Sequence, residues 1–155
     1  MPNYDINSLV GIGRAEWQIE GLISKGIGIL VGAGGAAKSM VAENMAWCTV
    51  FEEPWLGCNV KPGNVLYINN DHTESAQARR FHRFTDGANN LHPQRHVLRY
   101  ETELYGFFKY RNLKEKVISY LEELRPTLCV IDTISTSMLS REDKVQDITP
   151  IEELL

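Results

Sequence analysis

The stretch GILVGAGGAAKS, residues 28–39, decides the fold. It opens with a short apolar run at 28–31 that is followed at once by small residues, so it predicts a buried strand leading into a loop. The next segment, residues 38–51, contains no Gly or Pro and intersperses apolar side chains among polar ones, which favours a helix. A strand, a glycine-rich loop and a helix are therefore expected in direct succession.

The loop in this stretch nearly matches the pattern G-x-x-x-x-G-K-[ST] of phosphate-binding loops. Small residues let successive backbone N–H groups surround phosphate oxygens, and the helix N-terminus adds a partial positive charge. Lys38 supplies a point charge to the outer phosphates, and the hydroxyl of Ser39 is a ligand for Mg²⁺. The pattern predicts a nucleotide site, with ATP as the expected ligand, made of Gly32, Ala33, Gly34, Gly35, Ala36, Ala37, Lys38, Ser39 and Met40.

Ala37 is the one departure from the pattern, because it stands where the last glycine belongs. Alanine keeps the backbone N–H but adds a methyl group close to where phosphate oxygens approach. If the position requires a positive φ or a close backbone approach, alanine costs free energy relative to glycine. We expect nucleotide binding to survive in a weakened form. The alternative, a glycine-rich turn followed by a chance lysine, is disfavoured by the strand before it and the helix after it.

Strands and helices alternate through the rest of the chain. The patterns predict strands at 65–68, 96–100 and 128–131, a helix capped by Thr73 that runs to about Phe84, and a helix at 112–124. Strands without polar alternation, separated by helices, predict an α/β fold whose parallel sheet is covered by helices on both faces. Ligands bind beyond the carboxyl ends of such strands. Gly32, Asn69 and Asp132 lie at three of these ends, so polar residues gather where a site belongs.

Two carboxylates complete the expected site. Asp132 closes the strand at 128–131, in the position where a carboxylate holds Mg²⁺ directly or through water; a turn aspartate is the alternative. Asp71 follows the strand at 65–68 and is expected to polarise an attacking water molecule. The alternative for Asp71 is a structural one, in the cap of the helix that follows.

Composition limits the other possibilities. The chain has 155 residues, enough for one domain, and its formal net charge of −4 provides no general attraction to nucleic acid or membranes. No apolar run approaches the roughly 20 residues of a membrane helix, and three cysteines without a Cys-x-x-Cys pair favour a reducing, cytoplasmic setting. A local basic cluster, Arg79, Arg80 and Arg83, is expected to be a solvated helix face rather than a phosphate or subunit contact.

The order of these segments resembles the RepA-like AAA ATPases, a branch of the RecA-like fold that includes plasmid and phage replicative helicases. Beyond the phosphate loop, the resemblance rests on residues 16–26, 53–57, 61–68 and 128–135. It implies a three-layer α/β/α RecA-like P-loop core with a mostly parallel sheet at 26–155, preceded by a lead-in segment at 1–25. Relatives continue after the strand that ends at Asp132, so we expect a core that is incomplete on its C-terminal side.

The resemblance also implies ATP binding and hydrolysis between neighbouring subunits of a ring, often a hexamer, with single-stranded DNA as a partner. Lys38 and Ser39 match the family's phosphate and Mg²⁺ residues, and Asp132 matches its Walker B carboxylate. Asp71 falls where the family usually has a glutamate, which is one methylene longer. Three functions therefore stand: a DNA-linked ATPase, a non-catalytic module that binds ATP or ADP, and a P-loop phosphotransferase. Ala37 and Asp71 favour the second, and the flanking segments disfavour the third.

Overall fold

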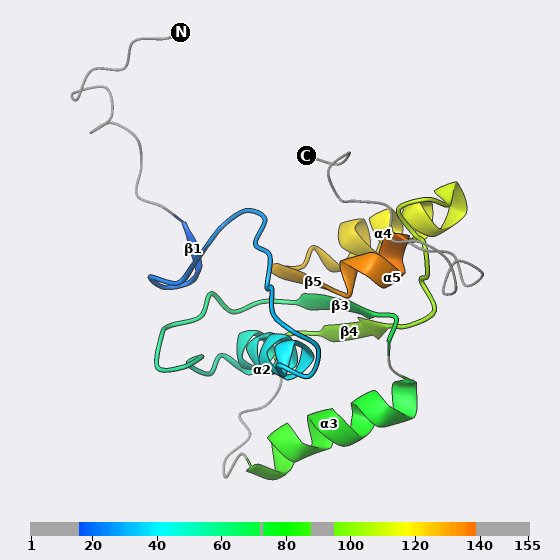
Figure 1. Cartoon of the computed structure of the whole chain (residues 1–155). Helices are drawn as coiled ribbons and strands as arrows, with labels where there is room; N and C mark the ends of the chain where they lie inside the picture. Colours follow the sequence, from blue (N-terminus) through cyan, green and yellow to red (C-terminus); the bar gives the residue numbers. More distant parts are fainter. Residues whose placement is uncertain (1–15, 72, 88–94, 139–155) are drawn as a thin grey trace, which may run out of the picture.

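A parallel three-stranded sheet forms the centre of the molecule in the computed structural model, which describes residues 16–71, 73–87 and 95–138 (Figure 1). Its strands lie in the order β4-β3-β5. The elements are β1 (Trp17–Ile19), β2 (Ile23–Ser24), α2 (Lys38–Phe51), β3 (Val65–Asn69), α3 (Glu74–Gly87), β4 (Leu98–Glu101), α4 (Arg111–Leu124), β5 (Leu128–Asp132) and α5 (Ile134–Met138). β1 and β2 form a separate antiparallel hairpin.

The central strand β3 is buried along its whole length, and its side chains alternate between two cores. On one face, Val65 and Tyr67 pack against three buried residues of α2: Ala42, Ala46 and Val50. On the other face, Leu66 and Ile68 pack against Val117 of α4 and against Leu104 and Phe107. Helices α2 and α4 thus lie on opposite sides of the sheet (Figure 1). Each fully buried apolar side chain contributes about 1.5–3 kcal/mol.

Helix α2 is buried on more than one side, which explains why its apolar residues do not form a single stripe. Besides the sheet, it contacts the β1 hairpin through Trp47 and Cys48, which cluster with Ile19 and Trp55. The helix ends at Glu52, which has a left-handed backbone with φ 61°, and its backbone N–H closes on the carbonyl of Cys48. Pro54 follows two residues later, where it cannot continue a helix.

Most of the elements expected from the sequence are present. The predictions of an α/β fold and of a parallel sheet are confirmed, as are both expected helices on either side of β4 and the strands at 65–68, 96–100 and 128–131. Most of the lead-in segment expected at 1–25 lies outside the described residues. Within the described ranges, no helix is long and apolar enough to cross a membrane.

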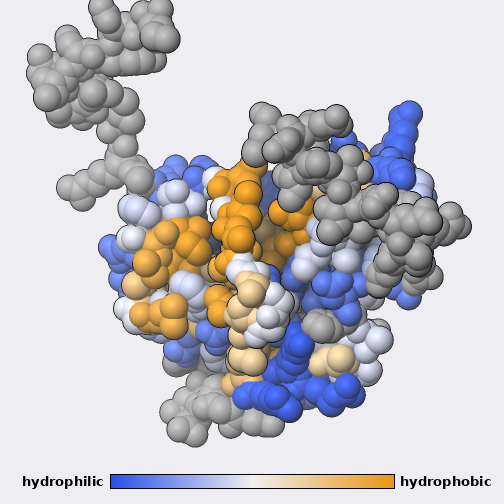
Figure 2. All heavy atoms as spheres, viewed as in Figure 1, coloured by the Kyte–Doolittle hydropathy of each residue, from blue (hydrophilic) through white to orange (hydrophobic). Residues whose placement is uncertain are grey.

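The strand predicted at 28–31 is wrong. Residues 27–33 have no regular secondary structure, and their apolar side chains face solvent: Ile27 is 101% exposed and Val31 83%. Figure 2 shows apolar surface gathered on this side of the molecule, which carries β1 and the segment leading to α2. A strand needs a neighbour that supplies ladder hydrogen bonds, and among the described strands none pairs with 28–31. A run of apolar residues indicates that a segment tends to be buried, but it does not specify which strand would pair with it.

Candidate functional site

The loop that precedes α2 closes around the side chain of Lys38. The ammonium group of Lys38 donates hydrogen bonds to the carbonyl oxygens of Gly32 and Ala33, over 2.7 and 2.8 Å. The stem of the lysine lies along Gly32, where an added Cβ would be 3.5 Å from its Cδ. An ammonium group has three donors, so these two bonds leave one for a phosphate oxygen.

The backbone of this loop turns into the left-handed region just before the helix. Ala37 has φ 57° and ψ 23°, and Gly35 has φ 76°. The sequence predicts a cost for alanine at position 37 if the backbone there has a positive φ. The structure shows this positive φ. A residue with a Cβ pays about 1–2 kcal/mol in this region, so Ala37 holds a conformation that glycine adopts more easily.

The N-terminus of α2 is open to an anion. The first hydrogen bond of the helix runs from the N–H of Val41 to the carbonyl of Ala37, so the N–H groups of Lys38, Ser39 and Met40 precede it. Ala37 has no side chain to cap them, and the first turn carries no acidic residue. Because an uncapped helix N-terminus is stabilised by negative charge, this geometry fits a phosphate group. Ser39 lies half-buried in this first turn.

Asp132 lies at the carboxyl end of β5, as the sequence predicts, and its side chain is held in place. It is 9% exposed, and its Oδ2 accepts a hydrogen bond of 3.0 Å from the hydroxyl of Tyr67. Its backbone carbonyl accepts a bond from the N–H of Asn70 on the neighbouring strand. A carboxylate has room for about four such contacts, so the bond from Tyr67 orients Asp132 and leaves capacity for a metal ion.

Asp71 is exposed at the same edge of the sheet. Its backbone N–H donates to the side-chain oxygen of Asn69, over 2.8 Å. Within the described part of the chain, no hydrogen bond or ion pair joins the Asp71 side chain to Lys38, Ser39 or Asp132. The cap of α3 is supplied by Thr73, whose hydroxyl accepts from the N–H of Ala76. The structure therefore brings Asp71 to the expected edge without joining it to the loop.

Comparison with known families identifies the chain. A sequence model described as an AAA domain matches residues 5–151. The chain belongs to the AAA domain family. The match supports an AAA-type P-loop ATPase, and this family implies nucleotide binding. Comparison with curated proteins and with solved structures finds no match.

Beneath the candidate site, this AAA domain contains a buried polar cluster that the sequence did not reveal. Glu43, one turn after Ser39, is fully buried and forms a 2.9 Å ion pair with Arg80 of α3. Tyr100 of β4 stacks on Tyr67, with ring centroids 5.5 Å apart. Burial, and then the charges of Glu43 and Asp132, raise the pKa of Tyr67 and Tyr100 above the usual tyrosine value. Both phenols are therefore protonated at neutral pH, and the hydroxyl of Tyr67 donates its hydrogen bond to Asp132.

A sequence signal for this cluster did exist. Glu43 shares the sheet-facing side of α2 with Ala46 and Val50, which follow it by three and seven residues. A charged residue on the apolar side of a helix indicates a buried partner. The expectation that Arg80 is solvated was wrong for that residue, while Arg79 and Arg83 are exposed as expected.

Asn70, another polar residue at this edge, has a structural role. Its side chain is 1% exposed, accepts a hydrogen bond from the N–H of Leu104 and donates one to the hydroxyl of Ser137. These bonds fasten the segment after β4 and helix α5 to the end of β3. Because its amide group both accepts and donates a hydrogen bond inside the protein, we assign Asn70 a supporting role beside the site.

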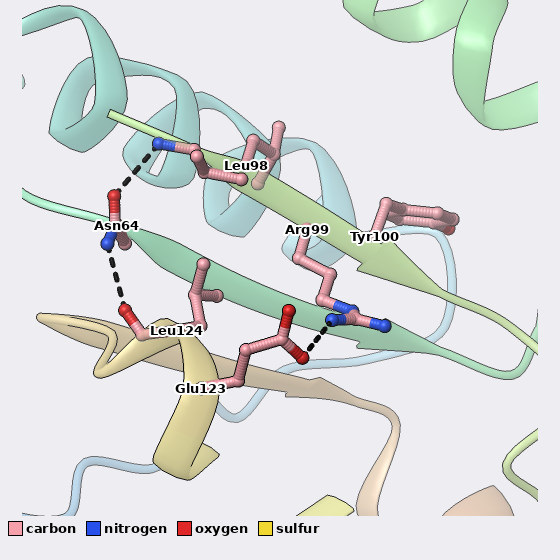
Figure 3. A pocket seen from close by; sticks show the side chains of 7 residues that line it. Asn64, Leu98, Arg99, Tyr100, Glu123 and Leu124 are labelled. Carbon is pink, nitrogen blue, oxygen red and sulfur yellow. Dashed lines mark hydrogen bonds and ion pairs between the residues drawn. The ribbon is translucent and has the colours of Figure 1, made fainter. Parts of the chain in front are cut away.

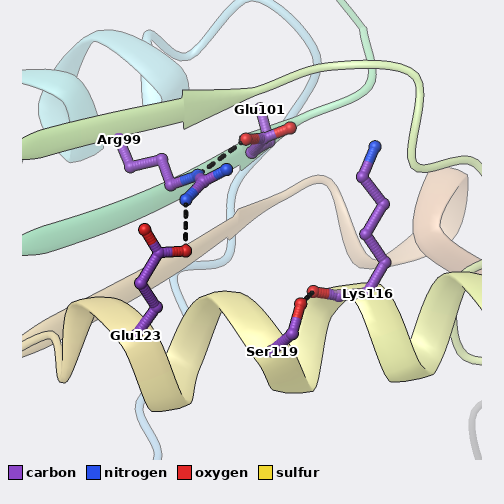
Figure 4. A network of polar contacts seen from close by, with 5 residues as sticks. All are labelled: Arg99, Glu101, Lys116, Ser119 and Glu123. Atoms are coloured by element: carbon purple, nitrogen blue, oxygen red, sulfur yellow. Dashed lines mark hydrogen bonds and ion pairs between the residues drawn. The ribbon is translucent and has the colours of Figure 1, made fainter.

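An open cavity of about 570 Å³ lies at the opposite end of the strands, near the start of β4 (Figure 3). The side chains of Asn64 and Arg99 in its lining are already paired. Asn64 donates to the carbonyl of Leu124 and accepts from the N–H of Val97. Arg99 bonds to Glu101 and Glu123 (Figure 4). Its guanidinium carbon also lies 3.7 Å from the centroid of the Tyr120 ring. These contacts join β4 to α4, so we interpret the cavity as a structural junction.

Proposed function

We propose that this AAA domain binds ATP with Mg²⁺ at residues 32–40 and at Asp132, and that it hydrolyses ATP. The observation that carries the proposal is the uncapped N-terminus of α2, reached through a left-handed turn that closes around Lys38. The family match supports the interpretation of this loop as a phosphate loop, since AAA domains bind nucleotide at a P-loop.

Each residue has a definite task in the proposal. The N–H groups of the loop and of the first turn of α2, together with Lys38, hold the phosphate oxygens. Ser39 and Asp132 are the two protein ligands of Mg²⁺, a number that suits an ion that also keeps waters and phosphate oxygens. When bound, Mg²⁺ neutralises charge on the outer phosphates. Asp71 orients a water molecule in line with the terminal phosphate.

We further infer a RepA-like domain with a three-layer RecA-like core, acting in a ring on single-stranded DNA. The order of the segments along the chain supports this assignment. The placement of α2 and α4 on opposite faces of the sheet supports the three layers. The exposed apolar run at 27–31 supports a sheet that is incomplete within the described residues, because such a run is expected to be buried.

A non-catalytic nucleotide-binding module is the second candidate. Two observations favour it. Ala37 occupies a strained backbone conformation, and among the described residues no hydrogen bond or ion pair directs the Asp71 carboxylate toward the loop. Such a module would bind ATP or ADP and act through assembly with other subunits.

The first experiment is a titration with a fluorescent ATP analogue in the presence of Mg²⁺. We expect saturable binding by the wild type, and a loss of about tenfold or more for Lys38→Ala, since a hydrogen bond to a charged group contributes about 1.5–3 kcal/mol. Lys114→Ala, at an exposed lysine of α4, is the matched control and should bind as the wild type does. A folded wild-type protein that binds no analogue would refute the proposal.

Turnover separates the two candidates. Phosphate release is measured with and without single-stranded DNA, for the wild type and for Asp71→Asn. Release that requires Asp71 supports the ATPase, and stimulation by DNA supports the helicase-type assignment. Tight binding without release under either condition would favour the non-catalytic module.

A further inference from the structure

Tyr67 carries a hydroxyl group into a hydrophobic core cluster. It lies in the middle of β3, it is fully buried, and it packs in the core cluster between the sheet and α2. A buried phenol hydroxyl normally has a hydrogen-bond partner, and here the partner is the carboxylate of Asp132 at 3.0 Å. A phenylalanine at this position would fill nearly the same space, so the hydroxyl requires a reason of its own.

The register of the sheet explains how the two side chains meet. Tyr67 pairs with Val130 on β5, and Asp132 lies two residues farther along the same strand. Residues two apart on a strand point to the same face, and a diagonal neighbour on the next strand is about 7–8 Å away. Only a long side chain with a donor at its tip spans that diagonal. The hydroxyl of Tyr67 therefore reaches the carboxylate from inside the core.

The phenol is also fixed in direction. Its ring stacks on Tyr100 at an interplanar angle of 25°, and Ala42 and Ala46 of α2 lie in the same cluster. The nearby carboxylate of Glu43, which is the other charged acceptor in this core, is engaged by Arg80 over 2.9 Å. The bond from Tyr67 to Asp132 is thus a hydrogen bond of 3.0 Å to a carboxylate, made by a buried and stacked side chain.

We propose that Tyr67 is a positioning residue for the Mg²⁺ ligand Asp132, which it holds at the carboxyl edge of β5 through its hydroxyl group. This inference rests on the proposed function, because it assumes that Asp132 binds the metal. Partners that orient a metal ligand influence metal affinity by roughly 10–100-fold. Tyr67 acts only through Asp132 and touches neither nucleotide nor metal.

The test compares Tyr67→Phe with Tyr100→Phe. Both substitutions remove one buried hydroxyl from the same stacked pair, but in the described structure the Tyr100 hydroxyl has no hydrogen-bond partner. The fluorescent ATP analogue is titrated at increasing Mg²⁺ concentration, and again in EDTA. We expect Tyr67→Phe to raise the Mg²⁺ concentration for half-maximal binding about tenfold and to leave binding in EDTA unchanged. Tyr100→Phe should match the wild type in both titrations.

Asp132→Asn distinguishes the possible failures. If Asp132→Asn leaves the Mg²⁺ dependence unchanged, Asp132 is not a metal ligand and the proposed function fails with the inference. If Asp132→Asn weakens Mg²⁺ binding but Tyr67→Phe behaves like Tyr100→Phe, only the inference is overturned. Urea unfolding of each variant identifies a purely structural role of Tyr67. If Tyr67→Phe is less stable and binds the ATP analogue equally weakly in Mg²⁺ and in EDTA, the positioning role is also overturned. In the double variant, Tyr67→Phe should add nothing to Asp132→Asn.

Discussion

At the residue scale, Ala37 places a methyl group on a left-handed backbone in the proposed phosphate loop. Its φ of 57° is a conformation that glycine adopts at no cost and alanine does not. We expect Ala37→Gly to stabilise the fold by about 1 kcal/mol, the balance of relieved strain and the greater freedom of glycine in the unfolded chain. Urea unfolding measures this difference. Affinity for the ATP analogue should rise a few-fold, because the methyl group beside the phosphate site is removed.

The neighbouring alanine provides the control. Ala36 is not among the described residues with a positive φ, so Ala36→Gly should destabilise the protein by about 0.5–1 kcal/mol. Equal effects of the two substitutions would show that position 37 carries no special strain.

Individual site residues were predictable where the reason for them is local. Lys38 and Ser39 follow from a motif eight residues long, and Asp132 from the end of an apolar strand. The bond between Tyr67 and Asp132 joins residues 65 positions apart and depends on which strands are neighbours. A single sequence contains no direct signal for that pairing, so the support beneath the site could be found only in the structure.

At the scale of elements, the Glu43–Arg80 pair joins α2 to α3 under the candidate site. Arg80→Met would leave the fully buried carboxylate of Glu43 without its cation. Breaking a buried pair costs about 3–5 kcal/mol, but the Arg80 side chain is 36% exposed, so solvent screening reduces the expected loss to about 2 kcal/mol. Urea unfolding at constant pH measures the loss.

Two further variants examine that explanation. Arg79→Met removes an exposed arginine from the same helix and should change stability by less than about 0.5 kcal/mol. Adding Glu43→Gln to Arg80→Met should recover part of the lost stability, because the buried charge is removed. A double variant less stable than Arg80→Met alone would contradict the assigned pairing.

Helices and paired strands were predictable as elements because their signals lie within short windows. Helix α4 follows from apolar residues at helical spacing, and β5 from four consecutive apolar residues. The run at 28–31 is also a short apolar segment and yet forms no strand. The difference lies in pairing, since β5 has β3 beside it and 28–31 has no described strand to bond with. The sequence thus shows which segments are apolar, but it does not show which strand each of them pairs with.

At the scale of the whole molecule, the exposed apolar run and the open edge of the sheet have a physical consequence. Ile27, Ile29, Leu30 and Val31 are all more than half exposed, and β5 is an edge strand of the described sheet. Contiguous apolar surface and an unpaired strand edge both promote association with other chains. We expect the 155-residue chain to associate as its concentration rises and to bind a hydrophobic dye in its folded state. Light scattering after size-exclusion chromatography measures the association.

Charged substitutions in the run should suppress this behaviour without unfolding the protein. Ile29→Lys combined with Val31→Lys places two ammonium groups on side chains that are already 66% and 83% exposed, so little buried contact is lost. We expect the double variant to remain monomeric at concentrations where the wild type associates, and to bind less dye. Ile118→Lys, at an exposed residue of α4, adds a charge elsewhere and should leave association unchanged. If the double variant still associates, the contact between chains lies on another surface. The exposed apolar run would then not be the cause of association.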